Sequence, residues 1–509
     1  MVPTASLVFS AVAVAAILKL LQSLILTNAM LRTSTYMQSG IFARLLALKP
    51  DFFKKTKSGA LSKMIMEFSD ISKIVSVKSI SACIGMILSL LYLIQIYRYA
   101  PNLFGCVMLV TALLGAFMIT EGTLYAKWLK KYSQSLSEMS GFCYELFSGI
   151  EQVKLNGAEA RMMNRWSEHY LTASRNEDKP FFLKYTEVFY KLVSVFSTAA
   201  IFLLGTNMSA SDYIAFAAAY GAYSAALMSV TQIIKTVSSF RSSYALIRPM
   251  LDAECEEYGG QKKKLTTLHG ELTITGLSFR YDKKAPYVIN GLSAHIRPGE
   301  SIGIIGASGC GKSTLLRLLL GFESPDEGSI YIDGFDLREL DLRSYRQKVG
   351  TVLQNTGLIS GDIYSNITVT KPGATLEEVT SVIEMAGLSK DIAALPMGLH
   401  TPVSHENCTL SGGQRQRILI ARALIHKPSI LIFDEATSAL DNITQAKITE
   451  NMNNLDCTKI IVAHRLSTIE QCDRILVLDK GGIAEEGRFN ELMNAEGILT
   501  QLTKKQITN

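Results

Sequence analysis

The sequence predicts an α-helical transmembrane domain followed by an α/β domain built around a phosphate-binding loop. Three observations lead to this fold class. The first half of the 509-residue chain holds five long apolar runs, the second half alternates apolar strands with helical patterns, and Gly306–Thr314 has the glycine spacing of a phosphate loop. Hydrophobic residues make up 48% of the chain, which is high for a soluble enzyme, and the excess lies in the first half.

The apolar runs are long enough, or nearly so, to span a bilayer as helices. They are Thr4–Leu26, Ile80–Tyr97, Leu103–Ile119, about Tyr190–Leu204 and Ile214–Ile234. Pro101 and Asn102 separate the second run from the third, and Gly205–Ser209 separates the last two, so each pair is expected to form a tight hairpin. The alternative, buried core helices of a large soluble protein, does not explain why charged residues collect between alternate pairs.

The distribution of basic residues predicts the topology. Lys and Arg are concentrated in residues 27–79 and 121–184, which we therefore expect in the cytoplasm together with the α/β half. Five spans then place the N-terminus outside a multi-pass protein of the cytoplasmic membrane, surrounded by lipid. The net charge of +6 follows from these inward-facing loops, so no nucleic acid is expected as a partner. Lys19 lies inside the first run, where snorkelling toward the interface explains it better than a place on a substrate path.

A polar linker marks the domain boundary. Residues 254–264 contain paired glutamates, paired glycines and three successive lysines. The expected domains are a membrane domain with cytoplasmic loops over 1–253 and a nucleotide-binding domain over 265–509. The eight cysteines are scattered without paired spacing, so we expect neither a zinc site nor a disulfide framework.

The phosphate loop is the first candidate binding site. Its residues are Gly306, Ala307, Ser308, Gly309, Cys310, Gly311, Lys312, Ser313 and Thr314. Backbone N–H groups in a glycine-rich turn at a helix N-terminus bind phosphates, and Lys312 adds a cation. The Ser313 hydroxyl is placed to ligate Mg²⁺. An apolar strand, Ser301–Ile305, precedes the loop, and a helix ended by Gly321 follows it, as such a loop requires.

Two adjacent carboxylates supply the expected metal ligand and general base. Asp434 ends the apolar strand Ile430–Phe433 and is the expected Mg²⁺ ligand, together with Ser313. Glu435 follows as the candidate general base for an attacking water. By itself an Asp-Glu pair after a strand is more often a helix cap, but its order after the phosphate loop favours catalysis.

A third element, between the other two, carries a resemblance to a known family. Leu410, Ser411, Gly412, Gly413 and Gln414 form the element that marks the ATP-binding-cassette (ABC) family, and this half of the chain closely resembles that family. The resemblance implies an ATPase coupled to transport, with ATP and Mg²⁺ as ligands. It also implies that Leu410–Gln414 closes over ATP bound to the opposite subunit, so that the chain works as a dimer.

The same resemblance assigns four further residues. Tyr281 would stack on adenine, Gln354 would contact ATP, sense Mg²⁺ and contact the membrane domain, and Asp441 would lie in the loop that crosses the dimer interface. His464 would be catalytic, in contact with the terminal phosphate. One departure lies just before Leu410, where Ser404–Thr409 lacks the family's glycines and His405 stands in place of a glutamate, which puts coupling in doubt.

The order of the domains resembles that of the half-transporter exporters of this family. A narrower resemblance is to the ATPase/permease subunits that export bacteriocins or other ribosomal peptides with nitrile-hydratase-like leaders. It rests on Gly149–Glu159, Asp212–Phe216, Leu320–Glu323, Leu395–Gly398 and Leu440–Ala446. It implies a peptide cargo and a homodimer, or a heterodimer with another half-transporter. Leader cleavage is then expected from a peptidase-containing partner.

Other functions remain open at this stage. The family's membrane domain has six spans, and five runs are counted here, so the first helix is expected to be missing. A truncated, non-transporting remnant that still binds ATP is therefore one alternative. Export of drugs or lipids is another, because the cargo cannot be read from these motifs.

Overall fold

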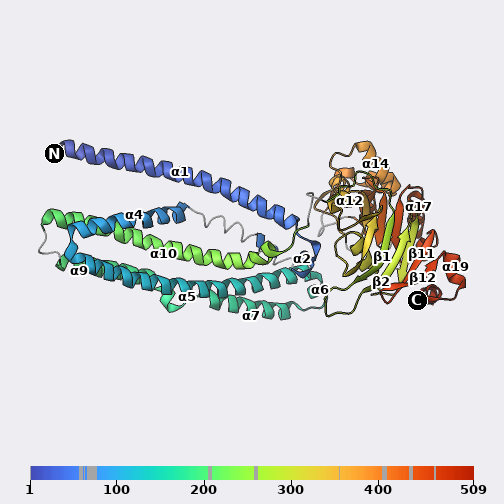
Figure 1. Ribbon diagram of the computed structural model, residues 1–509, viewed down its shortest axis with the longest axis horizontal. Helices are drawn as coiled ribbons and strands as arrows, with labels where there is room; N and C mark the ends of the chain where they lie inside the picture. The colour runs from blue at the N-terminus through green and yellow to red at the C-terminus, as the bar shows by residue number, and fades with distance from the viewer. Residues whose placement is uncertain are drawn as a thin grey trace. The chain divides into compact units, whose positions relative to one another are not determined.

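The computed structural model describes residues 2–56, 61, 64–65, 77–204, 209–256, 262–354, 356–403, 410–434, 440–463 and 466–508. The chain divides into two compact units, Met1–Glu256 and Glu257–Asn509. The helical unit and the sheet-containing unit are both visible in Figure 1. The assignment of residues 1–253 and 265–509 to two functional domains stays a prediction.

The first unit is built from helices. They are α1 (Val2–Leu46), α2 (Pro50–Lys55), α4 (Val77–Tyr99), α5 (Pro101–Ser148), α6 (Ile150–Leu155), α7 (Glu159–Glu177), α8 (Phe181–Lys184), α9 (Thr186–Leu204) and α10 (Ala210–Asp252). A bilayer core is crossed by about 20 helical residues. Helices α1, α5 and α10, with 45, 48 and 43 residues, are twice that length and so extend well beyond any membrane they cross.

Each of the five expected apolar runs lies within a helix, namely α1, α4, α5, α9 and α10. Among the described residues, the helices Pro101–Ser148 and Ser211–Asp252 are long and apolar enough to cross a membrane by length and composition. The expected break at Pro101 is confirmed, because α4 ends at Tyr99 and α5 begins at Pro101. The second expected turn, 205–208, lies outside the described residues.

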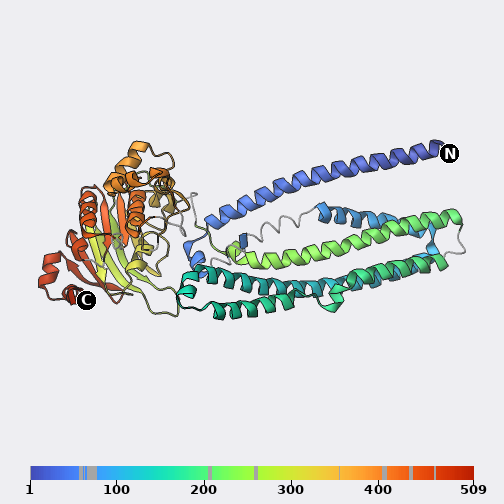
Figure 2. The ribbon, with the colours of Figure 1, turned by 180° about the vertical axis from the view of Figure 1, so that it is seen from behind.

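Helices α4, α5, α7, α9 and α10 pack side by side, and much of their apolar surface faces outward. Helix α10 packs against α4 and α5, and α5 also packs against α7 (Figures 1 and 2). Large apolar side chains on their outer faces, such as Ile87, Leu113 and Phe196, are more than 60% exposed. A surface of this kind suits contact with lipid and would be unstable in water.

The second unit contains a parallel sheet and an antiparallel sheet. The six-stranded sheet has the order β12-β11-β3-β10-β9-β6, and the four-stranded sheet has the order β2-β1-β4-β5. In the larger sheet, β11, β3, β10, β9 and β6 are parallel and β12 is antiparallel. Its strands are β3 (Ser301–Gly306), β6 (Val349–Val352), β9 (Ile430–Asp434), β10 (Thr458–Val462), β11 (Arg474–Asp479) and β12 (Gly482–Gly487). The smaller sheet contains β1 (Leu272–Phe279), β2 (Ile289–Ile296), β4 (Glu327–Ile332) and β5 (Phe335–Asp336), and β7 (Gly361–Asp362) pairs with β8 (Pro402–Val403).

Short helices cover the sheets and enclose two large cores. They are α11 (Lys312–Leu319), α12 (Leu342–Arg346), α13 (Ile363–Thr368), α14 (Leu376–Met385), α15 (Ser389–Ala394), η1 (Gly398–His400), α16 (Gly412–Leu424), α17 (Asn442–Asn453), α18 (Leu466–Ile469), α19 (Phe489–Asn494) and α20 (Ile498–Thr508). One core joins the two sheets around α11, and the other lies among α13, α14 and α16. The expected strand before the phosphate loop and the helix that follows it are confirmed as β3 and α11.

The first strand of this unit differs from the sequence prediction. Its alternation at Leu272–Ile274 and Leu277–Tyr281 predicts two edge strands, but the structure forms one strand, β1, in the interior of its sheet between β2 and β4. The register shifts between Ile274 and Leu277, where Gly276 adopts φ +55°. This bulge lets the strand continue across a residue pair that breaks the alternation.

We expect Ile460→Ala to destabilise the second unit strongly. Ile460 is fully buried on β10, in the middle of the six-stranded sheet. Such a truncation costs about 2–5 kcal/mol, or roughly 4–20 °C in melting temperature for a unit of this size. Scanning calorimetry of the full chain in detergent checks this. Ile443→Ala on α17 is the control, since Ile443 is 84% exposed; equal shifts for the two variants would contradict the core assignment.

Candidate nucleotide site

The phosphate loop leaves the carboxyl end of β3, a strand buried along its whole length. Gly309 and Gly311 adopt φ +83° and +106°, a region that favours glycine. A Cβ at Gly311 would lie 2.7 Å from Ile289 Cδ1, and one at Gly306 would collide with the carbonyl oxygen of Leu478. The spacing of glycines therefore reflects both backbone angles and the lack of room around the loop.

Lys312 lies inside the loop that it follows. Its side chain is buried, and Nζ donates to the carbonyl oxygens of Gly306 at 2.8 Å and Ala307 at 3.0 Å. The ammonium is thus at the mouth of the turn, where a phosphate would exchange these two carbonyl acceptors for charged ones.

Ser313 and Asp434 meet at the carboxyl edge of the parallel sheet. The Ser313 hydroxyl donates to Asp434 Oδ2 at 3.3 Å, and the Asp434 side chain is buried at the end of β9. A hydroxyl and a carboxylate held together are suitable ligands for Mg²⁺, which usually takes one or two carboxylates and fills its other positions with phosphates and water. Among the described residues, no group of three or more His, Cys, Asp or Glu side chains converges.

Tyr281 stands beside the phosphate loop and is half exposed. It follows β1, and its hydroxyl lies 3.1 Å from Thr314 Oγ1. Phe279 supports the ring edge-on, with the two centroids 5.0 Å apart. The sequence alone assigned Tyr281 by resemblance, and the structure brings it to the helix that begins at the loop.

Gln354 lies in an exposed turn just after β6, the neighbour of β9. The segment that follows is held by Asn366, whose amide bonds both the N–H and the carbonyl of Ile359. Arg422 on α16 donates in turn to Asn366 Oδ1 at 2.6 Å and to the Asn366 carbonyl at 2.8 Å. The helix that begins with the Leu410–Gln414 element is thereby tied to the chain that follows Gln354.

The element Leu410–Gln414 forms the start of α16. Leu410 is buried, while Ser411 is exposed and caps the helix by accepting from the Gln414 N–H. The Gln414 side chain returns a bond to the Ser411 N–H, which completes a capping box. The N-terminus of α16 therefore presents a serine and glycine N–H groups on the surface, as binding of an anion from outside requires.

Two residues that support this element were not found from the sequence. Asp391 on α15 accepts from Gln414 Nε2 at 2.9 Å and from Arg417 Nη1 at 2.8 Å. Arg417 also donates to the Gly387 carbonyl at 2.6 Å. The described hydrogen bonds of the element thus run within α16 and to α15, and not to the phosphate loop. No local sequence pattern indicates this pairing, because its partners lie more than 20 residues apart.

Asp441 caps α17 and stays ionised. Its carboxylate accepts from the Thr444 N–H at 3.0 Å, and hydrogen bonding to this N–H lowers the pKa of Asp441. A lowered pKa keeps the negative charge at the surface of this helix N-terminus at neutral pH.

Several predicted residues lie outside the described residues. These are the expected catalytic pair Glu435 and His464, and Ser404–Thr409 with the departure at His405. Asp434 and Val462 are register partners on β9 and β10. Strands β9 and β10 therefore end side by side, β9 one residue before Glu435 and β10 two residues before His464.

Cys310 is buried within the loop. Its Sγ lies 3.9 Å from Lys312 Nζ, and a Cβ at Gly306 would lie 2.6 Å from the same sulfur. The thiol therefore fills the space under the turn.

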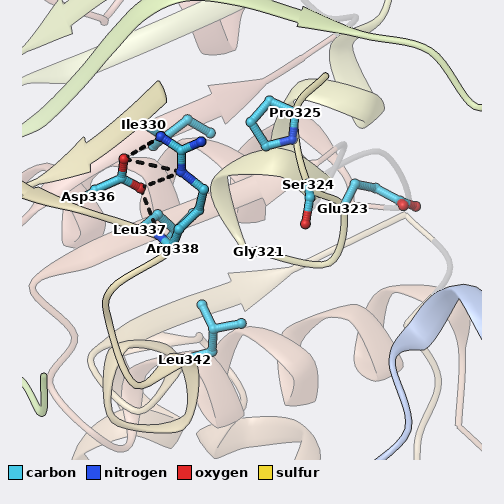
Figure 3. Close-up of a pocket in the computed structure, with 9 residues that line it drawn as sticks. All are labelled: Gly321, Glu323, Ser324, Pro325, Ile330, Asp336, Leu337, Arg338 and Leu342. Atoms are coloured by element: carbon cyan, nitrogen blue, oxygen red, sulfur yellow. Dashed lines mark hydrogen bonds and ion pairs between the residues drawn. The ribbon is translucent and has the colours of Figure 1, made fainter. Parts of the chain in front are cut away.

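A small open cavity lies beyond α11, with room of about 60 Å³. Its lining shares no residue with the expected nucleotide site. Figure 3 shows Arg338 laid against Asp336, with Nη2 2.6 Å from Oδ2, and this bond lowers the pKa of Asp336. The space suits a few water molecules and is far below the size of a ligand pocket.

The chain matches known families in both units. Residues 289–438 match the family model of the ABC transporter, and residues 1–235 match that of the ABC transporter transmembrane region. The exotoxin translocation ATP-binding protein PaxB of Pasteurella aerogenes is 31% identical over 497 residues, which cover 96% of this chain and 70% of that protein. The alpha-hemolysin translocation ATP-binding protein HlyB of Escherichia coli is 31% identical over 489 residues, which cover 94% and 69%.

A solved structure shows the same architecture. The structure of a bacterial Atm1-family ABC exporter with ATP bound superimposes with a TM-score of 0.88 at 26% identity, covering 96% of this chain and 88% of that one. The fold and the matches together define an ATP-driven exporter of the half-transporter type. The chain belongs to the ABC transporter family. It is a membrane protein whose cytoplasmic ATPase domain binds ATP and couples its hydrolysis to transport, which confirms the expected fold class and enzyme class.

We expect Lys312→Ala to lower ATP hydrolysis by about 10²-fold or more, because the loop loses its cation for the outer phosphates. Release of inorganic phosphate by the full chain in lipid nanodiscs measures this. Lys447→Ala, at an exposed position on α17, is the matched control and should keep the original rate. Equal rates for the two variants would exclude Lys312 from the site.

Tyr281 gives a second test, because its ring and its hydroxyl can be removed separately. If the ring stacks on adenine, Tyr281→Ala raises the KM for ATP about tenfold. This factor corresponds to the free energy that one base–aromatic stack usually contributes to binding. Tyr281→Phe removes the hydroxyl, which lies 3.1 Å from Thr314 Oγ1, but keeps the ring, and should keep KM near its original value. A phenylalanine variant as impaired as the alanine variant would mean that the hydroxyl, and not stacking, matters.

Proposed function

We propose that this chain exports a ribosomally made peptide, such as a bacteriocin, across the cytoplasmic membrane as one half of a dimeric exporter. The observation that carries the proposal is the similarity of 96% and 94% of this chain to proteins whose names describe translocation of exotoxin and alpha-hemolysin. The resemblance of Gly149–Glu159 and the other quoted segments to leader-peptide exporters narrows the cargo to peptides.

The residues of the site have distinct roles in this proposal. Backbone N–H groups of the phosphate loop and the Lys312 ammonium bind the phosphates of ATP, and Tyr281 stacks on adenine. Ser313, Asp434 and Gln354 hold Mg²⁺; the first two fit this role, because their oxygens already lie 3.3 Å apart. When bound, Mg²⁺ neutralises charge on the outer phosphates. Glu435 orients water and accepts its proton, and His464 contacts the terminal phosphate.

The need for two chains follows from the N-terminus of α16. Ser411 and Gly412 are exposed there, and the described bonds of Ser411 run to Gln414 within the same helix. We infer that Leu410–Gln414 binds ATP held by the phosphate loop of a second half-transporter, with Asp441 at the same interface. The second half is another copy or a related chain, and a peptidase-containing partner would remove the leader.

The test compares the full chain with Glu435→Gln in lipid nanodiscs, with and without a candidate leader peptide. We expect Glu435→Gln to lower Mg²⁺-dependent hydrolysis by about 10²-fold or more, and the leader to stimulate the unmodified chain. The same chain in proteoliposomes should move the leader-bearing peptide in an ATP-dependent manner. A peptide of the same composition in scrambled order is the control.

Other outcomes would replace the proposal. Stimulation by amphiphilic drugs or lipids, but not by the leader, would indicate a different cargo. A further outcome is that the unmodified chain binds ATP but neither hydrolyses it nor transports any cargo, alone or with a candidate partner chain. This outcome would indicate a remnant without transport activity.

A further inference from the structure

A carboxylate in the membrane unit is buried between three helices. Glu121 on α5 is only 3% exposed. Its Oε1 lies 3.3 Å from Lys235 Nζ on α10, and its Oε2 accepts from the Tyr190 hydroxyl on α9 at 2.6 Å. Each oxygen therefore has its own partner, and each partner comes from a different helix.

The surroundings of this group are apolar. Tyr190 is itself buried and packs with Leu114 and Met118 of α5 and with Ile234 of α10. An ionised carboxylate in such surroundings is stable only with a close counter-charge and satisfied lone pairs.

Helix α5 is tightly packed against an α10 side chain at the same level. A Cβ at Gly122 would collide with Cγ2 of Ile234. Because glycine has no Cβ, the two helices can pack closely at position 122. The ion pair links them at the neighbouring positions, 121 and 235.

The three residues border the expected membrane spans. Glu121 follows the run Leu103–Ile119, Lys235 follows Ile214–Ile234, and Tyr190 begins the fourth run. Beyond this level α5 continues for about 40 Å and α10 for about 25 Å, at 1.5 Å per residue. Helix α5 leads to the loop helix α6, and α10 leads into the chain that joins the ATPase unit.

We propose that Glu121, Lys235 and Tyr190 form a clasp that makes α5 and α10 move as one lever and so couples ATP hydrolysis to export. They are positioning residues, because they lie far from the phosphate loop in the sequence. The inference rests on the proposed function only in its transport assay, which uses the proposed peptide cargo. Because Glu121 is nearly inaccessible, a cargo charge has no open path to it in this conformation.

Two other ion pairs among the described residues of this unit have a different geometry. Arg248–Asp252 lies within α10, with both side chains more than 60% exposed, and Lys154–Glu159 joins exposed neighbours in the sequence. Exposed pairs contribute little. Arg248→Met is therefore a matched control on the helix that carries Lys235.

The test separates a mechanical role from a folding role. Lys235→Met leaves a buried carboxylate without its counter-charge and lowers both stability and coupling. The neutral double variant Glu121→Gln/Lys235→Met removes the buried charge but not the need for a link between α5 and α10. The exchanged pair Glu121→Lys/Lys235→Glu restores that link.

In proteoliposomes we expect the neutral double variant to melt near the original temperature and hydrolyse ATP at a similar basal rate. Its peptide transport per ATP should nevertheless fall at least about fivefold, the lower end of typical coupling between sites. The exchanged pair should recover most of this loss, and Arg248→Met should show none. A neutral double variant that transports normally, or a folded exchanged pair that stays uncoupled, would overturn the proposal.

A second measurement does not depend on the cargo. Spin labels at Ser140 on α5 and Arg241 on α10, in a full chain whose other cysteines are replaced, report the distance between the two helices. The clasp predicts the same narrow distance distribution with and without ATP, and a broader one in the neutral double variant. If the unmodified chain does not transport the peptide, the proposed cargo is wrong. The distance distributions between the two spin labels still test the clasp.

Discussion

The bond between Ser313 and Asp434 joins segments 121 residues apart, and the rest of the nucleotide site depends on it. It forms because β3 and β9 are both parallel to β10, so that their loops leave the sheet at one edge. Ligands of open α/β sheets bind at this edge. A shift of β9 by one residue would turn Asp434 to the other face of the sheet and leave Ser313 without its carboxylate.

The local parts of the site could be predicted from the sequence, and the links between them could not. Gly306, Gly309 and Gly311 have spacing that only a few backbone turns require, so the loop, its strand and its helix were all predictable. The anchoring of Gln414 and Arg417 by Asp391 depends on how α15 and α16 pack, which no short pattern encodes. The prediction of two edge strands near Gly276 was wrong for a similar reason, because a bulge within one strand interrupts the alternation in the same way as a loop between two strands.

In the membrane unit, composition was enough to predict helices but not their mutual contacts. All five apolar runs lie in helices, since few other structures satisfy the backbone in lipid. Lys19 is recognisable in the sequence as an unusual residue because it lies inside an apolar run. Glu121 and Lys235 flank their runs and therefore resemble ordinary interfacial residues until the packing of α5, α9 and α10 shows them paired.

The hydrogen bonds of Lys312 have a consequence for nucleotide binding. The Lys312 ammonium donates to the Gly306 and Ala307 carbonyls at the start of the same turn. These bonds tie the end of the turn back to its beginning. The same bonds must be given up each time ATP arrives, so part of the intrinsic affinity is spent on displacing the lysine. ATP therefore binds less tightly to this loop than to a loop of the same shape in which these two bonds do not form.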